Sequence, residues 1–373
     1  MRISRRMLFM LVTVLVVLVA STIAYAAVFT DITGHWAEDE ITSMYEEGIV
    51  KGHEDGTYGP EELVTRAQMA VFLDRLHGDL SAEMGDGGMD ADSCKACHDD
   101  SSLITGKQTA WAMSGHGAGT AFDYAGGRSS CTGCHSGEGF SAMVAAGQSP
   151  NEVETASDEP TRQDCRACHD IHTSYTDADW SLETTAPVEM FEVEGQTYDG
   201  GEGNLCANCH QVRHIFSDYV DGDTAEVGST HWGAHHGPQS AVLLGIAGAG
   251  DVEGSPSIHY SLVGDTCVTC HLGENNNHTF EPDTAACSTC HGDVDDFDID
   301  GTQTDVQDKL DQLETALKAD GLLDAEGGIV TGTYAKAKAA ALWDWTMLSE
   351  DGSLGVHNPN YAIDLLDAGL AAF

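Results

Sequence analysis

The stretch CRACHDIH, residues 165–172, contains two cysteines three positions apart, a histidine directly after the second cysteine and another histidine three residues later. Side chains at positions i, i+3 and i+4 lie on one face of a helical turn, so Cys165, Cys168 and His169 can act on one ligand. The same C-x-x-C-H pattern recurs at residues 94–98, 131–135, 206–210, 267–271 and 287–291. All 12 cysteines of the chain belong to these six copies.

C-x-x-C-H is the attachment sequence of c-type haem, in which two cysteines form thioether bonds to the porphyrin and the histidine binds its iron. Zinc ribbons use C-x-x-C pairs without requiring a histidine after each one, and disulfides do not require this spacing. The sequence therefore predicts six covalently bound c-type haems. The expected thioether residues are Cys94, Cys97, Cys131, Cys134, Cys165, Cys168, Cys206, Cys209, Cys267, Cys270, Cys287 and Cys290, and the expected proximal iron ligands are His98, His135, His169, His210, His271 and His291.

Each iron has a sixth coordination position, and neutral imidazole is the commonest metal ligand in proteins. Of the 18 histidines, nine lie outside the six motifs and beyond the three near the N-terminus. Their sequence contexts favour His116, His172, His259 and His278 as distal ligands. Because histidine is in surplus, the methionines Met113, Met143, Met190 and Met347 are interpreted as packing residues.

Three further histidines lie in THWGAHHGPQ, residues 230–239. In an extended backbone His235 and His236 point to opposite sides, so the pair can serve two irons or one. We expect at least one distal ligand here and favour His236 over His235.

The N-terminus carries Arg2, Arg5 and Arg6, then an apolar run, and fits a secretory signal peptide over residues 1–26. An uncleaved membrane anchor is the alternative. Removing these residues leaves 13 basic and 61 acidic side chains, a formal charge of −48, which argues against a nucleic-acid partner. We expect a secreted protein.

Residues 94–373 provide 280 residues for six haems, about 47 each. We therefore expect a mostly α-helical, loop-rich fold whose interior is built around porphyrins, with little sheet and little room for a continuous aliphatic core. The helical periodicity of Val306, Leu310, Leu313 and Leu317 predicts one helix, and residues 333–348 predict a second within a C-terminal helical segment, 302–373.

Over residues 94–373 the chain resembles multihaem c-type cytochromes of extracellular electron transfer. The resemblance rests on the six motifs and on the stretches SGH (114–116), HHGPQ (235–239) and NNNHTF (275–280). The ending DGSLGVHNPNYAIDLL, residues 351–366, is similar to the C-terminal part of the ammonia-forming cytochrome c nitrite reductase superfamily. That resemblance implies that His357 is a distal ligand. Nitrite-reducing members have lysine in place of histidine at the catalytic haem motif, whereas all six motifs here end in histidine.

These observations predict an extracellular cytochrome that carries electrons along six mainly bis-histidine haems to external acceptors or other multihaem cytochromes, with no catalytic residue. Related hexahaem cytochromes polymerise, so a homopolymer filament is a natural extension. The alternative function is a multihaem reductase of nitrite, hydroxylamine or a sulfur oxyanion. It would need an open haem position, and the acidic charge of the chain repels anions.

Residues 27–78 form a separate predicted module that resembles an S-layer homology repeat, on the residues Phe29, Asp31, Gly34, His35, Trp36, Gly48, Gly52, Asp55, Gly56, Pro60 and TRAQ (65–68). The resemblance implies binding to a secondary cell-wall polymer, with Trp36 and Arg66 near the sugar, and a location at the cell wall or S-layer. The alternative is a small helical domain with Trp36 in its core.

Residues 79–93 are rich in Gly, Asp and Met and are predicted to be a flexible linker. Further along, Asp296, Asp298, Asp300 and Gly301 match the start of an EF-hand loop, but Gln307 occupies its twelfth position and cannot supply the bidentate carboxylate. We favour an acidic segment at a helix N-terminus over a calcium site.

Overall fold

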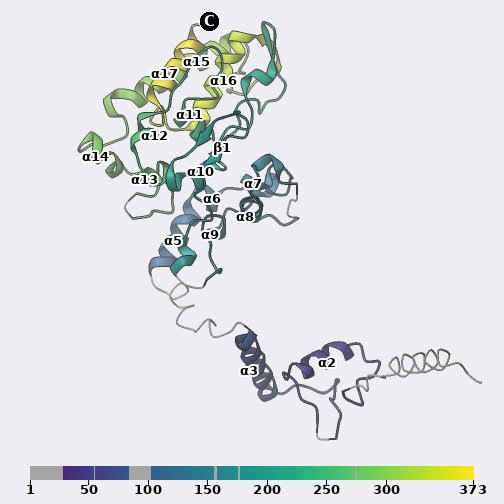
Figure 1. Cartoon of the computed structure of the whole chain (residues 1–373). Helices are drawn as coiled ribbons and strands as arrows, with labels where there is room; N and C mark the ends of the chain where they lie inside the picture. Colours follow the sequence, from purple (N-terminus) through teal and green to yellow (C-terminus); the bar gives the residue numbers. More distant parts are fainter. Residues whose placement is uncertain (1–27, 54, 84–101, 155–157, 175–176, 274) are drawn as a thin grey trace, which may run out of the picture. The chain divides into compact units, whose positions relative to one another are not determined.

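The computed structural model describes residues 28–53, 55–83, 102–154, 158–174, 177–273 and 275–373 (Figure 1). The chain divides into two compact units, Met1–Cys94 and Lys95–Phe373. The predicted signal peptide and the first haem motif, with Cys94, Cys97 and His98, lie outside the described residues. None of the helices in the described ranges is both long and apolar enough to cross a bilayer.

The N-terminal unit contains helices α2 (Glu38–Glu46) and α3 (Arg66–Glu83). Its small core holds Phe29, Ile32 and Ile41. A Cβ atom at Gly52 would lie 2.1 Å from the Phe29 ring, so only glycine fits at this position. Thr65 and Gln68 form the predicted capping box at the start of α3, because each backbone N–H is bound by the other side chain, at 2.8 and 3.2 Å.

Helix α3 continues to Glu83, five residues into the predicted linker. Leu80, Ala82 and Glu83 are good helix formers, and no glycine follows Gly78 until Gly85, so the chain can continue the helix. The rest of the linker lies outside the described residues.

The second unit is mostly short helices and loops, which confirms the predicted fold class. Its helices are α5 (Ser102–Met113), α6 (Gly115–Ala118), α7 (Thr132–His135), α8 (Gly137–Ala146), α9 (Cys165–Cys168), α10 (Asn204–Ala207), α11 (Gln239–Leu244), α12 (Ile258–Leu262), α13 (Cys267–His271), α14 (Ser288–His291), α15 (Thr302–Ala319), α16 (Lys336–Asp351) and α17 (Pro359–Leu370). Single turns of 3-10 or π type lie at η2 (Phe122–Gly126), η3 (Pro150–Glu152), η4 (Asp177–Trp180), η5 (Gly201–Gly203), η6 (Phe216–Tyr219), η7 (Thr284–Cys287) and η8 (Ile299–Gly301).

The strands in the described residues are short and antiparallel. Strands β1 (Val188–Glu189) and β2 (Thr197–Tyr198) form one pair, and β3 (Val220–Asp221), β4 (Thr224–Val227) and β5 (Gly332–Ala335) form a three-stranded sheet in that order. Strand β5 corrects the predicted second helix, which begins at Lys336 and not at residue 333. Residues 332–335 pair with β4, and this strand pairing outweighs the helical propensity of the neighbouring sequence.

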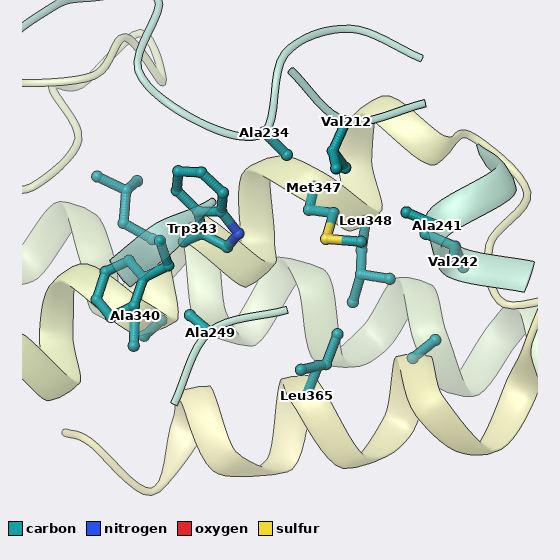
Figure 2. Close-up of a cluster of buried hydrophobic side chains, with 14 of the residues drawn as sticks. Val212, Ala234, Ala241, Val242, Ala249, Ala340, Trp343, Met347, Leu348 and Leu365 are labelled. Atoms are coloured by element: carbon teal, nitrogen blue, oxygen red, sulfur yellow. The ribbon is translucent and has the colours of Figure 1, made fainter. Parts of the chain in front are cut away.

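The C-terminal helices α15, α16 and α17 pack on one another and contribute 15 of the 32 buried residues of a continuous hydrophobic core. Leu313 and Leu317 on α15, as their periodicity predicts, are fully buried, and so are Trp343 and Met347 on α16 and Leu365 on α17. Figure 2 shows these α16 and α17 side chains against Ala241, Val242 and Ala249.

This core corrects the expectation that the chain has little room for aliphatic packing. Residues 302–373 contain no haem motif, and their helices bury their apolar stripes against one another and against residues of the preceding segment such as Val242 and Leu244. Met143, Met190 and Met347 are buried, as expected of packing residues, whereas Met113 is 67% exposed and does not pack.

Candidate haem sites

The five motifs within the described residues each occupy a short helical turn, as the C-x-x-C-H spacing predicts. Helices α7, α9, α10, α13 and α14 begin inside or directly before their motifs. All ten described cysteines are free thiols, and so remain available for thioether bonds. The local fold therefore presents two thiols and one imidazole together at each motif.

Capping residues fix several segments that carry the spare histidines. Ser114 accepts a hydrogen bond from the Gly117 N–H at the start of α6, which carries His116. Ser257 does the same for the His259 N–H at the start of α12. Asn358 caps α17 directly after His357 and also donates to the Val242 carbonyl at 3.0 Å. These caps position each imidazole relative to the rest of the unit.

Each of the five described motif histidines faces one spare histidine. The ring centroids are separated by 6.1 Å in His116–His210, 6.1 Å in His135–His235, 6.2 Å in His169–His278, 6.2 Å in His259–His291 and 6.3 Å in His271–His357. The five separations are nearly equal, whereas the angles between the ring planes range from 26° to 84°.

That geometry fits two imidazoles on opposite sides of one metal ion. A metal–imidazole bond is about 2.0 Å long and the nitrogen lies about 1.2 Å from the ring centre, so two trans ligands place their centroids about 6.4 Å apart. All five distances lie within a few tenths of an ångström of this value. The residues present therefore fit an iron with two axial histidines at each of these motifs.

The second ring nitrogen is hydrogen-bonded in six of these ten imidazoles. In each of them Nδ1 lies 2.6–3.0 Å from an oxygen acceptor. The six contacts are His169 with Trp180 O, His210 with Gln239 Oε1, His259 with Val356 O, His271 with Phe280 O, His278 with Asn276 O and His357 with Asp351 Oδ1. Such bonds fix the tautomer and leave Nε2 as the nitrogen that can bind a metal. Hydrogen bonds of this type are usual around metal-bound histidine.

Burial also keeps two of the spare histidines neutral. Desolvation, with the nearby His210, lowers the pKa of His116 to about 4. Desolvation, with the charge of Arg213, lowers the pKa of His235 to about 4. Neutral imidazole is the form that binds a metal, so both side chains are ready to act as ligands near neutral pH.

Near His235 the geometry differs from the expectation, because His235 and not His236 faces the motif histidine His135. The prediction assumed an extended backbone, but His235 has a left-handed conformation with φ of 75°, and Gly237 follows with φ of 90°. The two side chains therefore do not alternate as in a strand. His236 instead points its Nδ1 to Glu350 at 2.7 Å.

The remaining spare histidines lie elsewhere. His214 contacts the Tyr219 ring at 6.2 Å, and the His231 N–H donates to Ser229 Oγ. His172 has a left-handed backbone with φ of 61°.

Neighbouring motifs contact one another through their cysteines. Cys134 Sγ lies 3.9 Å from the Asn208 carbonyl, and Cys209 Sγ lies 3.9 Å from the Gly133 carbonyl. Helix α13 of the fifth motif contacts turn η5, which leads directly into α10 of the fourth motif. Ala167 of the third motif shares a small core with Cys209. The second, third, fourth and fifth motifs therefore lie next to one another in space.

An open pocket of about 860 Å³ adjoins the fifth motif. Cys270 and His278 line it, together with Lys107 of α5, whose Nζ donates to the Asn275 carbonyl at 2.6 Å. A pocket of this size can hold a large organic group.

No group of three His, Cys, Asp or Glu side chains suited to a metal ion occurs among the residues that the structure describes. At the predicted acidic segment, Asp298 accepts a hydrogen bond from the Thr304 N–H at 3.1 Å, in the first turn of α15. This contact fits a role for Asp298 at the helix N-terminus.

In the N-terminal unit, Trp36 is 86% exposed, so the alternative with Trp36 in a core is wrong. His35 stacks beside it at 5.5 Å and contacts Glu61 through Nε2 at 3.1 Å. Arg66 lies on the exposed first turn of α3. Asp31 accepts the N–H groups of Tyr58 and Gly59, both at 2.8 Å, which holds the loop before α3 in place.

Comparison with known proteins identifies this unit. Residues 28–70 match the family model of the S-layer homology domain. Over 49 residues the chain is 45% identical to an S-layer protein of Bacillus licheniformis and 43% identical to S-layer protein EA1 of Bacillus anthracis, in each case over 13% of this chain. The chain covers 6% of the length of these relatives. An S-layer homology domain indicates a location at the cell wall.

The solved structure of the outer cell wall cytochrome OcwA aligns with 71% of this chain and 50% of its own chain. The TM-score is 0.48 and the sequence identity is 24%.

Sequence patterns did not indicate the residues that surround the imidazoles. Gln239 and Arg213 lie far along the chain from His210 and Cys131, the motif residues that their side chains contact. Asp351 could be suspected only from its place in the DGSLGVH ending.

Proposed function

We propose that this chain is a multihaem c-type cytochrome that carries electrons at the cell wall along six covalently attached haems. The observation that carries the proposal is the set of five histidine pairs at 6.1–6.3 Å, each joining one C-x-x-C-H histidine to one histidine from another segment. When bound, haem supplies the Fe(III)/Fe(II) couple, and the protein sets its spacing and potential.

The assignment of distal ligands follows from these pairs. We assign His116 to the fourth motif, His235 to the second, His278 to the third, His259 to the sixth and His357 to the fifth. Because those five motif histidines are matched, we assign His172 to the first motif and His98. His236 is placed outside the ligand set, where its contact with Glu350 supports a hydrogen-bonding role.

The contacts between motifs support a conducting function. Cys134 lies beside the fourth motif and Cys209 beside the second, and α13 of the fifth motif contacts the turn that leads into the fourth, so these three motifs form one continuous series. Helix α13 and turn η7 are also in contact, which brings the sixth motif beside the fifth. Haems attached there would be close neighbours, as electron transfer through the protein requires.

The reductase alternative has less support. A histidine on each side of the metal position would leave no open coordination site at the five described motifs. Two histidine ligands at every haem favour electron transfer over substrate binding.

The N-terminal unit would hold the cytochrome on a secondary cell-wall polymer. Exposure of Trp36 and Arg66 supports this role, since an indole face and a guanidinium can bind sugar rings and anionic groups. Other multihaem cytochromes or external acceptors would receive the electrons, and a homopolymer filament is compatible with this role.

Low-temperature EPR of the purified ferric protein, with haem content from mass spectrometry, tests the proposal. We expect six haems, all low-spin and unchanged by nitrite or hydroxylamine. One high-spin haem that responds to either ligand would favour the reductase, and a protein without covalent haem would refute both functions.

A further inference from the structure

The loop 275–280 contacts histidines of three different pairs. It carries His278, which faces the motif histidine of the third motif. The Phe280 carbonyl accepts a hydrogen bond from Nδ1 of His271, in the fifth motif, at 2.8 Å. The Phe280 ring lies 5.0 Å from the ring of His116, which faces the fourth motif. The position of this loop therefore affects three of the predicted haem sites.

A lysine from a distant helix binds this loop. Lys107 on α5 is half-buried, and its Nζ donates to the Asn275 carbonyl at 2.6 Å and to the Asn276 carbonyl at 2.5 Å. Asn276 has a left-handed backbone with φ of 48°, a conformation that asparagine adopts more readily than most residues. The ammonium group thus holds the loop at an irregular turn.

The Asn276 carbonyl is also the acceptor for the imidazole of His278. His278 Nδ1 lies 2.7 Å from this oxygen, so the imidazole and the ammonium share one acceptor, which has two lone pairs. The Lys107 nitrogen is therefore no more than about 5.2 Å from Nδ1, near enough for its charge to act on the ring.

The acceptor of His357 differs in charge from that of His278. His357 Nδ1 contacts a carboxylate, that of Asp351, whereas His278 Nδ1 contacts a carbonyl that also binds a cation. The two contacts should change the basicity of the two imidazoles in opposite directions.

We propose that Lys107 is a positioning residue for the third haem and raises its reduction potential through the Asn276 carbonyl that it shares with His278. The ammonium draws electron density from the shared oxygen, so His278 donates a weaker hydrogen bond and becomes a less basic ligand, which favours ferrous iron. Reduction also lowers the charge of the iron by one, so a fixed cation nearby stabilises the reduced form. This inference rests on the proposed function and on its assignment of His278 to the third motif.

Redox titration of the full-length haem-loaded protein tests the proposal, with haem content and spin state measured in each variant. Lys107→Met removes the charge and the donors but keeps the length of the side chain. We expect a lower potential for one haem, so that its ferrous-to-ferric ratio at the wild-type midpoint falls severalfold. Lys107→Arg keeps the charge and the donors and should stay close to wild type. His278→Met identifies the third haem, because methionine ligation raises its potential.

Lys318→Gln is the matched control, because it removes one positive charge from α15, a helix without a haem motif. It should leave all potentials unchanged.

An unchanged or higher potential in Lys107→Met would overturn the proposal, and so would an equal fall in Lys107→Arg. A high-spin haem in the ferric Lys107→Met protein would show that the contact only keeps the ligand in place, which would overturn the electrostatic role.

If Lys107→Met does not take up six haems, infrared redox-difference spectra of wild-type protein with isotope-labelled lysine decide the question. Ammonium bands should change as the third haem is reduced, and unchanged bands would refute the proposal. A wild-type protein without six haems, or His278→Met with every potential unchanged, would instead contradict the proposed function.

Discussion

At the scale of single residues, the choice between His235 and His236 depends on one backbone angle. The left-handed φ of 75° at His235 is uncommon for a residue with a side chain and is typical of sites where geometry serves a function. This backbone angle directs the His235 imidazole to His135, and the His236 imidazole contacts Glu350.

Substitution of His235 by alanine is therefore expected to turn one of six haems from low-spin to high-spin, because one iron loses its distal ligand. His236→Ala should leave all six low-spin. EPR of both ferric variants measures the difference, and the opposite result would assign the ligand to His236.

Asp351 is the residue that most directly affects a predicted ligand. Its Oδ1 lies 2.6 Å from His357 Nδ1, and its side chain is almost fully buried. Burial alone lowers the pKa of His357, but the charge and hydrogen bond of Asp351 outweigh it and raise that pKa above its usual value. The carboxylate thus makes His357 a more basic ligand.

Replacing Asp351 with asparagine should raise the potential of the fifth haem. A hydrogen bond to a neutral acceptor is weaker by about 1 kcal/mol. For a one-electron couple this difference corresponds to a shift in reduction potential of about 40 mV. Spectroelectrochemical titration measures the shift, and Asp367→Asn on the exposed face of α17 is the control. An unchanged or lower potential would contradict this role.

At the scale of elements, the helices α15, α16 and α17 form a support for the haem region. Helix α17 approaches closely enough that a Cβ at Gly369 would lie 2.9 Å from Leu313. Asn358 and His357 precede α17, so the packing of this helix positions a predicted iron ligand.

Leu313→Ala is expected to lower the free energy of unfolding by about 2–5 kcal/mol, because it leaves a cavity between α15 and α17. Urea denaturation measures the loss, and Gln312→Ala, at an exposed neighbouring position, should change it little. Equal stability of the two variants would show that this contact does not support the fold.

Helix α16 also carries a buried acid. Asp344 is 2% exposed and accepts the Ala249 N–H at 2.7 Å, and burial raises its pKa well above the usual value despite that bond. The protonated form of Asp344 stabilises the folded protein. This stabilisation is fully present below the pKa of Asp344 in the unfolded chain, about 3.9, and is lost as pH rises through its higher pKa in the folded protein.

Asp344→Asn should therefore be more stable than wild type at alkaline pH, with a difference that shrinks as pH falls toward 4. Urea midpoints from pH 4 to 9 measure this trend. A difference that grows at low pH would mean that Asp344 is charged in the folded protein.

At the scale of the whole molecule, one S-layer homology domain precedes the unit that carries the C-x-x-C-H motifs in a single chain. Trp36 and Arg66 are both exposed and lie outside the small core of the first unit. The proposed wall attachment can thus be tested independently of the haems.

Trp36→Ala and Arg66→Ala should each weaken binding to purified cell walls that carry secondary polymer by about tenfold or more, as expected of central binding residues. Haem content and spin state should not change. Leu63→Ala is the matched control, because Leu63 is 95% exposed in the same unit. Wall binding that none of these changes affects would exclude the assigned residues.

The sequence by itself determined the features that depend on neighbouring residues. The C-x-x-C-H turns, the capping box at Thr65 and the buried stripe of α15 each follow from spacing within a few residues, and the structure contains them. The S-layer homology pattern was also recognisable, since its glycines and Asp31 serve local turns.

Tertiary structure alone decided which histidine faces which motif. Each pair joins segments that are far apart in the chain, as in His169 with His278, and with a left-handed residue at His235 it is His235, and not His236, that faces His135. Strand β5 and the aliphatic core of the C-terminal helices likewise depend on partners that local propensity does not encode. The physical reason is that histidine pairing and burial arise only when distant segments pack together.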